Sequence, residues 1–567
     1  MPMHENVDGW VLCDGCRSII YGKRLSQNAS VCPRCGHCAP LTALQRLAHL
    51  ADPGTVAPID VDVATEDPLG FVDSSRTYPE RLAKARAATG LAEAVVCADI
   101  VIDGIPVVAA VMDFGFLGGS LSGAVGEMIT LAAERALDRR TPMVVVTASG
   151  GVRMHEGVIG LMQMVKTTQA MNLLDEAGLP TICVITDPTY GGVAASFAML
   201  GDVLLAEPGA RIGFAGPRVI AQTTGEALPP GFQTAESVLR LGFLDQICSR
   251  SELRSRLGRL LSIATRHQAQ ASHEPAQAMT VRDYATLPQR PAWETVLRAR
   301  ELARPTTSDY IRLMCDDFEE LHGDRTGGDC PSVITGVARL GGEPVVIIGH
   351  EKGHNAAQLV AHHYGMPGPA GYRKAGRVLR LAAKWGLPVV TLVDTPGADP
   401  GLDSELQGQA TAIAQNLALM ARTPVPIVTV VTGEGCSGGA LAIAVADRVL
   451  MLEHATYTVI SPEGCAAILW RDAAAAPQAA DSLRLDARSL LELGVVDGVV
   501  PEPEGGAAAD PAGIAAQLAA SIRAELTDLV GLDPAQLLAN RRARYRRFGG
   551  RSEKHENAVP VGERGVA

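Results

Sequence analysis

The sequence predicts an α/β protein made of two similar halves. Two observations carry this prediction: apolar runs that end in Gly-rich turns recur along the chain, and the same order of runs occurs twice. The chain has 567 residues, of which 47% are hydrophobic, 4% are aromatic and 59 are glycines. Small residues and frequent turns are typical of strand and helix layers joined by tight connections. The length allows several domains.

The repeat is visible in three pairs of segments, whose spacing stays between about 238 and 247 residues. The pairs are 106–108 with 344–346 (both Pro-Val-Val), 141–151 with 387–398, and 179–192 with 425–439. A near-constant spacing indicates an internal duplication. Because each half makes two Gly-rich turns, the sequence predicts two similar sites and one reaction that uses two paired substrates.

The composition of the chain argues against nucleic-acid-binding, membrane-spanning and secreted proteins. The net charge of −12 argues against a general nucleic-acid binder. No apolar run reaches the length of a membrane span, and residues 1–13 lack the pattern of a signal peptide. Five of the twelve cysteines lie in the first forty residues, and the rest are scattered, as in proteins of a reducing compartment. We therefore expect a cytoplasmic protein.

Residues 1–40 are predicted to form a zinc module. Cys13 and Cys16 form one Cys-x-x-Cys turn, and Cys32 and Cys35 form a second one, with fifteen residues between the two turns. Four thiolates at this spacing suit one tetrahedral zinc ion, and a closed site of this kind is structural, not catalytic. The alternatives are a disulfide pair or a redox dithiol, and Cys38 in place of Cys35 as a ligand. Four basic residues near these cysteines offer nucleic-acid binding as an alternative role, which a solvated face explains equally well; they are Arg17, Lys23, Arg24 and Arg34.

The first half is predicted over residues 41–265, beginning with a linking stretch to about residue 75. Periodicity and turn signals then predict strands that alternate with helices. The expected elements are a helix at 78–88, two strands over 95–112 joined at Asp103-Gly104, a helix at 121–138, a strand at 143–148 with the turn Ser149-Gly150-Gly151, a helix whose Met162, Met164 and Met171 fill the core, and a strand at 181–186 that leads to Tyr190-Gly191-Gly192.

Residues 266–298, rich in Gln, Ala, His and Pro, are the predicted linker to a second half over 299–525. That half is expected to contain strands at 343–349, 389–393 and 427–431, helices at 371–385 and 407–422, and turns at Gly397 and Gly438-Gly439. Residues 526–567 are predicted to form a basic helix and a disordered tail. The basic cluster at 541–547 is either a carrier-docking or phosphate-facing surface or a solvated helix face.

The Gly-rich turns point to a particular chemistry. A strand that ends in Gly-Gly and opens a helix exposes backbone amides at the positive end of that helix. Such amides hold a phosphate or a developing oxyanion. No turn carries the Lys of a phosphate-binding loop or a nucleophile motif. The sequence thus predicts amide holes that stabilise an enolate or a ureido oxygen; alternatively, the glycines only permit close helix–strand packing.

Long segments resemble a known family. Residues 144–171, 186–222 and 228–236, together with the four cysteines, resemble the β subunit of bacterial acetyl-CoA carboxylase carboxyltransferase. Residues 304–503 resemble the α subunit. The α-like motifs are ELHGDR (320–325), VVIIGHEKG (345–353), GYRKAGRVLRLA (371–382), DTPGADPG (394–401), GEGCSGGALAIAVADRVLML (433–452) and YTVISPEGCAAILW (457–470). The chain resembles a fusion of the two subunits.

The resemblance implies a crotonase-like fold, a β-β-α superhelix, in each half, and transfer of a carboxyl group from carboxybiotin to acetyl-CoA to give malonyl-CoA. It implies that amides of Gly150 and Gly151 stabilise the thioester enolate, and that Gly439 and Ala440, beside Gly438, polarise the biotin ureido oxygen. The candidate substrate-binding residues are Arg153, Gly191, Gly192, Gly397, Ala398, Arg373 and Lys374. Arg153 faces either CoA phosphates or an internal carboxylate such as Glu156; Arg373 and Lys374 contact phosphate or serve packing.

The resemblance also implies partners. The sequence has no ATP-grasp signature and no Met-Lys-Met biotinylation site, so a biotin carboxylase and a biotin carboxyl carrier protein are expected to be separate chains. The cofactors are structural Zn²⁺ and biotin on that carrier, and the substrate is an acyl-CoA thioester. Since sites of this family are completed by a second copy, we expect a homodimer or a higher homo-oligomer.

Three features depart from the family pattern: Asp399 precedes the proline of DTPGADPG, Cys436 replaces a glycine, and residues 354–364 lack the usual basic character. All lie in the second half, so an acyl-CoA carboxyltransferase with another acceptor is an alternative. A malonyl-type decarboxylase is another, and a nucleic-acid-binding regulator that uses the zinc module is less favoured. Hydratase or isomerase chemistry would need a carboxylate beside an amide hole.

Overall fold

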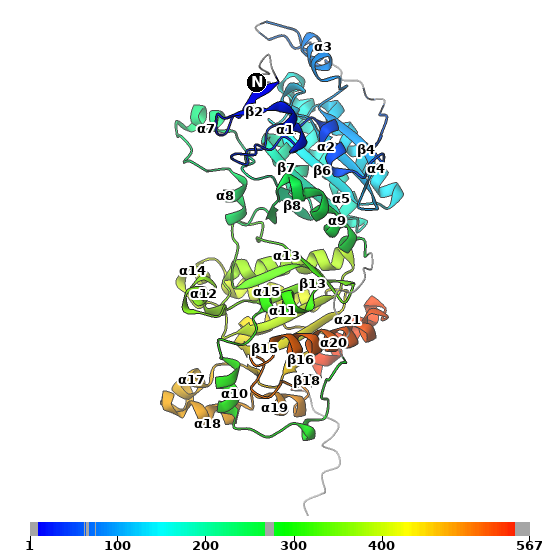
Figure 1. The fold of residues 1–567 in the computed structure, drawn as a ribbon. Helices are drawn as coiled ribbons and strands as arrows, with labels where there is room; N and C mark the ends of the chain where they lie inside the picture. Colours follow the sequence, from blue (N-terminus) through cyan, green and yellow to red (C-terminus); the bar gives the residue numbers. More distant parts are fainter. Residues whose placement is uncertain (1–8, 62, 64–66, 74, 267–276, 550–567) are drawn as a thin grey trace, which may run out of the picture.

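The structure, a computed structural model, contains two stacked α/β units that share one chain (Figure 1). It describes residues 9–61, 63, 67–73, 75–266 and 277–549. Each unit is built around an eight-stranded sheet. The predicted α/β fold in two halves is therefore confirmed.

The first sheet has the strand order β10-β8-β7-β6-β5-β4-β3, and β9 pairs with β7. β4 and β5 form an antiparallel hairpin through Asp103-Gly104, as predicted, and both residues have the positive φ that a tight hairpin turn needs. β5 to β8 are parallel, and every residue of β6 is buried because helices cover both faces. The strands are β3 (Ala57–Pro58), β4 (Val95–Ile102), β5 (Ile105–Met112), β6 (Met143–Ser149), β7 (Thr181–Tyr190), β8 (Val203–Ala206), β9 (Ile212–Gly213) and β10 (Gln246–Ile247).

The second sheet repeats this plan in the order β11-β12-β13-β14-β15-β16-β18, with β17 paired to β15. β12 and β13 form the matching hairpin, and β13 to β16 are parallel. The strands are β11 (Asp317–Glu320), β12 (Val333–Leu340), β13 (Glu343–His350), β14 (Val389–Thr395), β15 (Ile427–Cys436), β16 (Arg448–Leu452), β17 (Thr456–Thr458) and β18 (Gly498–Val500).

Helices join the parallel strands, and their ends follow sequence signals. α13, for example, begins at Pro369 and ends before Gly386, whose φ of 65° provides a left-handed cap. The helices of the first half are α2 (Ala43–Leu50), α3 (Tyr78–Thr89), α4 (Gly123–Arg139), α5 (Gly157–Glu176), α6 (Gly191–Ala194), α7 (Pro217–Thr224), α8 (Ala235–Arg240) and α9 (Arg250–Ala264). Those of the second half are α10 (Ala292–Ala299), α11 (Thr307–Met314), α12 (Ala356–Ala361), α13 (Pro369–Trp385), α14 (Leu402–Leu406), α15 (Gln409–Met420), α16 (Ser437–Leu441), α17 (Pro462–Cys465), α18 (Ala476–Leu483), α19 (Ala487–Glu492), α20 (Pro511–Val530) and α21 (Pro534–Arg546).

The duplication inferred from the sequence is present in the topology. β4 and β12 begin 238 residues apart, and β7 and β15 begin 246 residues apart. The register shifts at the same place in both sheets, before Ser149 in β6 and before Thr395 in β14. Ser149 then pairs with Thr189, as Thr395 pairs with Gly435. The two pairs of strand ends are thus structural counterparts.

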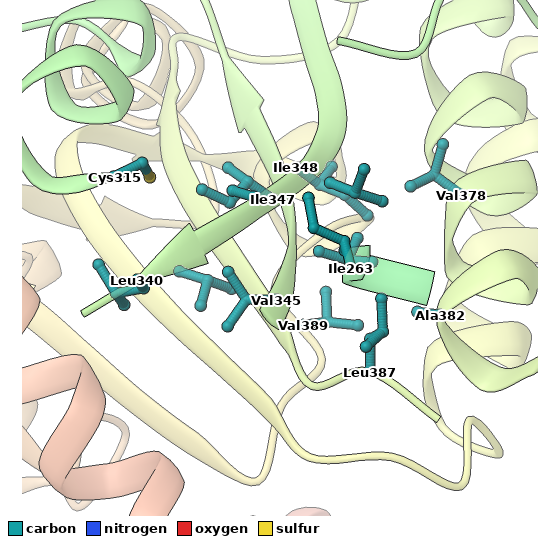
Figure 2. Packing of buried hydrophobic residues seen from close by; sticks show 14 of the residues in the cluster. Ile263, Cys315, Leu340, Val345, Ile347, Ile348, Val378, Ala382, Leu387 and Val389 are labelled. Atoms are coloured by element: carbon teal, nitrogen blue, oxygen red, sulfur yellow. The ribbon is translucent and has the colours of Figure 1, made fainter. Parts of the chain in front are cut away.

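The two halves share an apolar core. Ile263, from the last helix of the first half, packs among second-half residues such as Leu387 and Val389 (Figure 2). All three are at most 1% exposed. Each buried side chain of this size contributes about 1.5–3 kcal/mol, so the halves are held in one arrangement.

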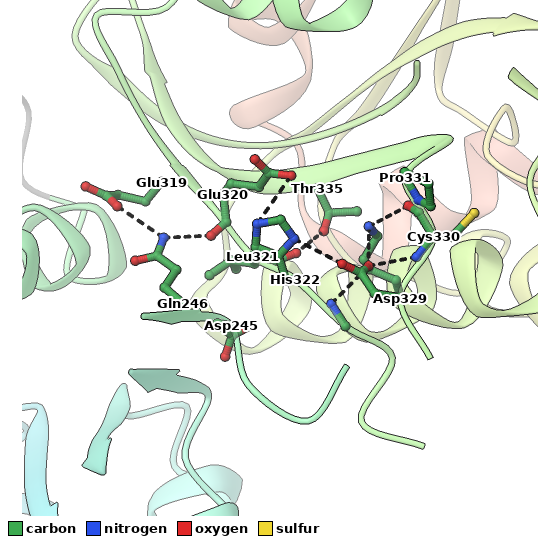
Figure 3. A network of polar contacts seen from close by, with 12 residues as sticks. Asp245, Gln246, Glu319, Glu320, Leu321, His322, Asp329, Cys330, Pro331 and Thr335 are labelled. Carbon is green, nitrogen blue, oxygen red and sulfur yellow. Dashed lines mark hydrogen bonds and ion pairs between the residues drawn. The ribbon is translucent and has the colours of Figure 1, made fainter. Parts of the chain in front are cut away.

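Polar contacts continue this junction along the sheet edges. The Gln246 side chain of β10 donates to the carbonyl of Glu320 at 2.6 Å, and the His322 amide donates to the carbonyl of Asp245 at 3.4 Å (Figure 3). The Asp245 carboxylate is fully buried and accepts from Arg377 at 2.8 Å. β10 of the first sheet therefore lies beside β11 of the second.

The zinc module contains β1 (Trp10–Leu12), β2 (Ile19–Tyr21) and α1 (Gly22–Gln27). It is fixed to the first half by Arg250, whose guanidinium donates to the carbonyls of Ala29 and Ala39 at 2.9 and 2.7 Å. Glu207 holds the same guanidinium from the other side, at 2.6 Å. The module is therefore docked through a buried ion pair.

Two predicted boundaries need correction. Within the predicted linker 266–298, residues 267–276 lie outside the described residues, but the rest belongs to the second half: Val281 pairs with Val499, and α10 packs on α18. The boundary at residue 525 falls inside α20. The predicted basic helix is α21, and most of the predicted tail lies outside the described residues.

Two arginines of the basic cluster on α21, Arg541 and Arg544, are buried. Arg541 is 1% exposed and binds Asp447 together with the carbonyls of Met420, Thr423 and Val425. Arg544 binds Asp497 with two hydrogen bonds of 2.6 Å. These two side chains anchor the helix. They therefore form neither the carrier-docking or phosphate-facing surface nor the solvated helix face that the sequence suggested.

Within the described residues, no helix combines the length and apolar character that crossing a bilayer requires.

Candidate active site

The first-half site is formed where β6 and β7 end. Gly151 has a φ of 125° and Gly191, at the start of α6, has a φ of 59°. A Cβ atom on Gly191 would lie 3.1 Å from the Cα of Gly151, so the two turns touch. Glycine is therefore needed here for both backbone conformation and close approach. The predicted pair of turns is brought together.

The second-half site repeats this arrangement where β14 and β15 end. Thr395 Oγ1 accepts from the amide of Gly397 at 3.0 Å, as Ser149 Oγ accepts from that of Gly151 at 3.0 Å. A Cβ atom on Gly439 would lie 2.3 Å from the amide nitrogen of Ala398. Gly397, Ala398, Gly438 and Gly439 are thus gathered at one place, as the sequence predicted.

The backbone amides of these turns differ in whether they already have a hydrogen-bond acceptor in the protein. Gly150 donates to the carbonyl of Gly118 at 2.8 Å and Gly151 donates to Ser149, so both predicted enolate donors already have acceptors. The first amides of a helix, by contrast, have no intrahelical acceptor. These are Gly191 and Gly192 in α6, and Gly438 and Gly439 in α16. The amide of Ala440 belongs to the same first turn of α16, so the predicted donor pair Gly439 and Ala440 stays a prediction.

Ser437 is the counterpart of Gly191. Its φ of 65° is in the left-handed region, beside the 59° of Gly191. β-Strand register makes Gly192 the counterpart of Gly438, since Tyr190 pairs with Gly213 as Cys436 pairs with Thr458. Sequence reasoning missed Ser437 because only the backbone angle distinguishes it from other serines.

Arg153 faces an internal carboxylate. Its guanidinium donates to both oxygens of Glu93, at 2.7 and 2.8 Å, and to the Tyr78 hydroxyl at 3.1 Å. Burial alone would lower the pKa of Arg153, but Glu93 and Tyr78 raise it overall. Arg153 is 1% exposed, so it does not reach a CoA phosphate. The partner is mainly Glu93, whereas Glu156 is held by Tyr78 at 2.6 Å.

Arg373 and Lys374 also have protein partners. Lys374 is 1% exposed and donates to Asp329 at 2.6 Å and to the carbonyl of Cys330 at 2.9 Å, which gives it a packing role. Arg373 donates to Asp324 at 2.7 Å and keeps part of its surface exposed.

A charged cluster lies under the second-half turn, and no spacing in the sequence indicates it. Lys352 Nζ lies 2.6 Å from Asp394 Oδ1 and 2.8 Å from Glu434 Oε2, and Arg300 binds Glu434 at 2.7 Å. Burial disfavours the charged form of Lys352, but the two carboxylates raise its pKa overall. Asp394 and Glu434 are therefore neutralised and do not provide the free base that hydratase chemistry needs.

Two of the departures from the family pattern have local explanations. Asp399 accepts from the Gly401 amide at 3.0 Å and from the Ser404 hydroxyl at 2.6 Å, so it shapes the loop before α14. Cys436 is buried, and burial raises the pKa of its thiol to about 11. A thiol in this environment stays protonated and unreactive.

The four predicted zinc ligands come together. Sulfur atoms of Cys13, Cys16, Cys32 and Cys35 all lie within 4.8 Å of one another. Cys13 and Cys35 are 3.7 Å apart, and Cys16 and Cys32 are 3.8 Å apart. Zinc–sulfur bonds of about 2.3 Å in a tetrahedron place sulfurs roughly 3.8 Å apart, so the residues fit zinc. Cys38 lies outside this group, and no disulfide joins the described cysteines.

Comparison with known proteins gives matches in both halves. A family model described as acetyl co-enzyme A carboxylase carboxyltransferase-like matches residues 249–549, and one described as the acetyl-CoA carboxylase zinc finger domain matches residues 10–35. An acetyl-coenzyme A carboxylase carboxyl transferase, subunits beta/alpha, from Parafrankia sp. is 58% identical over 95% of this chain and 91% of its own length. The protein of the same name from Clostridium tetani is 41% identical over 95% and 93%.

Solved structures show the same architecture. Transcarboxylase 12S, described as a hexamer with methylmalonyl-coenzyme A bound, has a TM-score of 0.69 at 23% identity, covering 89% of this chain and 92% of that one. A single-chain, multi-domain long-chain acyl-CoA carboxylase has a TM-score of 0.66 at 21% identity, with 88% of this chain and 46% of that one covered. The likeness confirms the crotonase-like fold.

Proposed function

The chain belongs to the family of acetyl-coenzyme A carboxylase carboxyltransferases whose beta and alpha subunits form one polypeptide, and we propose that it transfers a carboxyl group from carboxybiotin to acetyl-CoA, giving malonyl-CoA. The observation that carries this proposal is the pair of equivalent glycine turns, one in each half. A reaction between two carbonyl-bearing substrates uses two such sites, one for each oxygen that gains negative charge.

We assign the first-half turn to the acyl-CoA thioester. Loss of a proton from the acetyl carbon places negative charge on the thioester oxygen, and fixed amides stabilise that charge. Because the Gly150 amide donates to the carbonyl of Gly118 and the Gly151 amide donates to Ser149, the donors in this assignment are Gly191 and Gly192. Gly151 then serves to bring its turn against Gly191.

We assign the second-half turn to biotin, which supplies the carboxyl group on a ureido nitrogen. Amides in the first turn of α16, those of Gly438, Gly439 and Ala440, would donate to the ureido oxygen and so weaken the bond between that nitrogen and the carboxyl group. The residues present fit this group: the amides are at the start of α16, and a Cβ atom on Gly438 would meet nothing within 4 Å. The protein then contributes orientation and electrostatics, without a nucleophile.

We further propose that a biotin carboxyl carrier protein and a biotin carboxylase are partners of this chain, and that they act with it in the cytoplasm. Acyl-CoA and the biotinylated carrier would meet at the paired turns. The overall negative charge supports neither a membrane nor a nucleic-acid partner.

An exposed apolar face supports assembly of at least two copies. The outer side of α5 and the turn before it expose large apolar side chains, Met154 at 80% and Val158 at 60% among them. The others on this face are Leu161, Met162 and Val165, so Met162 does not fill the core as the sequence predicted. Apolar patches of this kind mark protein interfaces. We expect gel filtration to give a homodimer or larger, and Val158→Glu with Met162→Glu to shift it toward one chain.

The test of the proposed activity is the reverse reaction with free biocytin. We expect purified protein to remove the carboxyl group of malonyl-CoA only when biocytin is present, and to prefer malonyl-CoA over methylmalonyl- and longer carboxyacyl-CoAs. A preference for a longer substrate would transfer the assignment to another acyl-CoA acceptor. Carboxyl loss without biocytin would instead indicate a malonyl-type decarboxylase.

A further inference from the structure

A polar pocket of about 330 Å³ lies where the two halves meet, and we call it the junction pocket. The first half contributes the C-terminal end of α5, with Asp175, and the segment before β8, with Asp202. The second half contributes Arg325, which follows β11, and one face of α13. The basic side chains on that face are Arg377, Arg380 and Lys384.

The length of two helices separates the junction pocket from the glycine turns. α5 begins at Gly157, a few residues after the first-half turn, and its 20 residues span about 30 Å before it ends near the pocket. α13 meets the second-half turn at its opposite end, where the Tyr372 hydroxyl donates to the carbonyl of Gly439 at 3.2 Å. Among the described residues, neither turn lines the pocket. A ligand in it is therefore distinct from the two substrates assigned above.

Positive charge exceeds negative charge in the junction pocket, although the net charge of the chain is −12. Arg325 and Arg377 share a single buried carboxylate, that of Asp245. Arg380 is exposed, and in the part of the chain that the structure describes it has no ion-pair partner. Four basic side chains thus face three carboxylates, which are Asp175, Asp202 and Asp245. One positive charge remains for a ligand.

Arg325 is held at the junction pocket at an energetic cost. Its φ of 61° is in the left-handed region, which residues other than glycine rarely adopt. Burial lowers the pKa of Arg325 to about 10 despite its pair with Asp245, and its Nε is buried without an acceptor among the described residues. The side chain still keeps 19% of its surface open. These costs are expected of a site that a bound anion completes.

We propose that the junction pocket binds the phosphate group of a small phosphate-bearing molecule, with Arg325 and Arg380 as donors from two different elements. A tetrahedral phosphate accepts from guanidinium groups that approach from several directions, whereas one guanidinium already matches a planar carboxylate. The volume suits a small molecule. Because Asp175 and Asp202 belong to one half and the arginines to the other, a phosphate bound here fixes the halves against each other.

Titration calorimetry on the full chain tests this site with three probes, inorganic phosphate, pyrophosphate and AMP, at one ionic strength set with chloride. We expect saturable binding and a rise in Tm. Equal affinity for phosphate and AMP would identify free phosphate as the ligand, and tighter binding of AMP would identify a phosphorylated metabolite. Either result supports the site.

Two substitutions should change the affinity in opposite directions. Arg380→Gln alters an exposed side chain, so it is expected to fold normally and to weaken binding about tenfold. Asp175→Asn removes the carboxylate that lies 3.0 Å from Lys384 and should tighten binding several-fold. The matched control is Arg422→Gln, an exposed arginine after α15 that does not line the pocket, and its affinity should stay within about twofold.

Three outcomes would overturn the proposal. The first is no saturable binding of any probe at millimolar concentration, and the second is an equal loss of affinity in Arg380→Gln and Arg422→Gln. The third comes from the reverse assay, in which we expect Arg380→Gln to leave the KM for malonyl-CoA within about twofold. A rise in this KM that matches the loss of phosphate binding would place the nucleotide part of the substrate in the pocket and exclude a separate site.

Discussion

The contact between Gly439 and Ala398 gives a sharp prediction for Gly439→Ala. The added Cβ would lie 2.3 Å from a backbone nitrogen, and ordinary contacts begin at 3.4 Å, so the turns must separate by about 1 Å. A displacement of about 1 Å in an active site costs roughly 10²-fold in rate, which corresponds to about 2.7 kcal/mol in the barrier. Overpacking of this kind costs roughly 1–3 kcal/mol of stability.

The assay is kcat for biocytin-dependent loss of carboxyl from malonyl-CoA, with calorimetry for stability. Gly438→Ala is the matched control for folding, because its Cβ would meet nothing within 4 Å. We expect Gly439→Ala to lose about 10²-fold in kcat and to melt lower, while Gly438→Ala melts like the unchanged chain. A kcat for Gly439→Ala within threefold of the unchanged chain would refute the idea that close contact of the turns sets the site.

Three other predictions follow from buried and titratable groups. Arg541→Met leaves the Asp447 carboxylate buried at 3% side-chain exposure without its partner, so urea unfolding should show a loss of about 3–5 kcal/mol; a loss below 1 kcal/mol would contradict the anchoring role of α21. Metal analysis should find one zinc per chain, and the double change Cys13→Ser, Cys32→Ser should abolish it; full zinc content in that variant would reject the ligand set. The bond to Asp329 raises the pKa of His322, so its stabilisation is complete below the unfolded value near 6.5 and is lost as pH rises through the folded value. The unchanged chain should therefore exceed His322→Gln in Tm by more at pH 6 than at pH 9, and an equal difference at both would contradict this.

Short sequence patterns were sufficient to predict the hairpins and helices that occur in both halves. The β4–β5 hairpin at Asp103-Gly104 and helix α13 between Pro369 and Gly386 follow from turn and cap chemistry written in a few adjacent residues. The four zinc ligands were also found from spacing alone, and their sulfurs do come together.

Contacts between distant segments could not be predicted in this way. Lys352, Asp394 and Glu434 come from three different strand ends, so no local spacing relates them. Arg541 looked like part of a surface cluster because its partner, Asp447, is 94 residues away. The occupied amides of Gly150 and Gly151 depend on Gly118 and Ser149, whose positions only the folded backbone fixes.

The most direct test of the proposed carboxyl transfer is a single-turnover reaction with a labelled carboxyl group. A carrier protein bearing ¹⁴C-carboxybiotin, freed of ATP and of biotin carboxylase, is mixed with this chain and acetyl-CoA. We expect label to move to malonyl-CoA without ATP, and Gly439→Ala to slow the transfer about 10²-fold. Label that stays on the carrier, or that moves equally well without the chain, would contradict it.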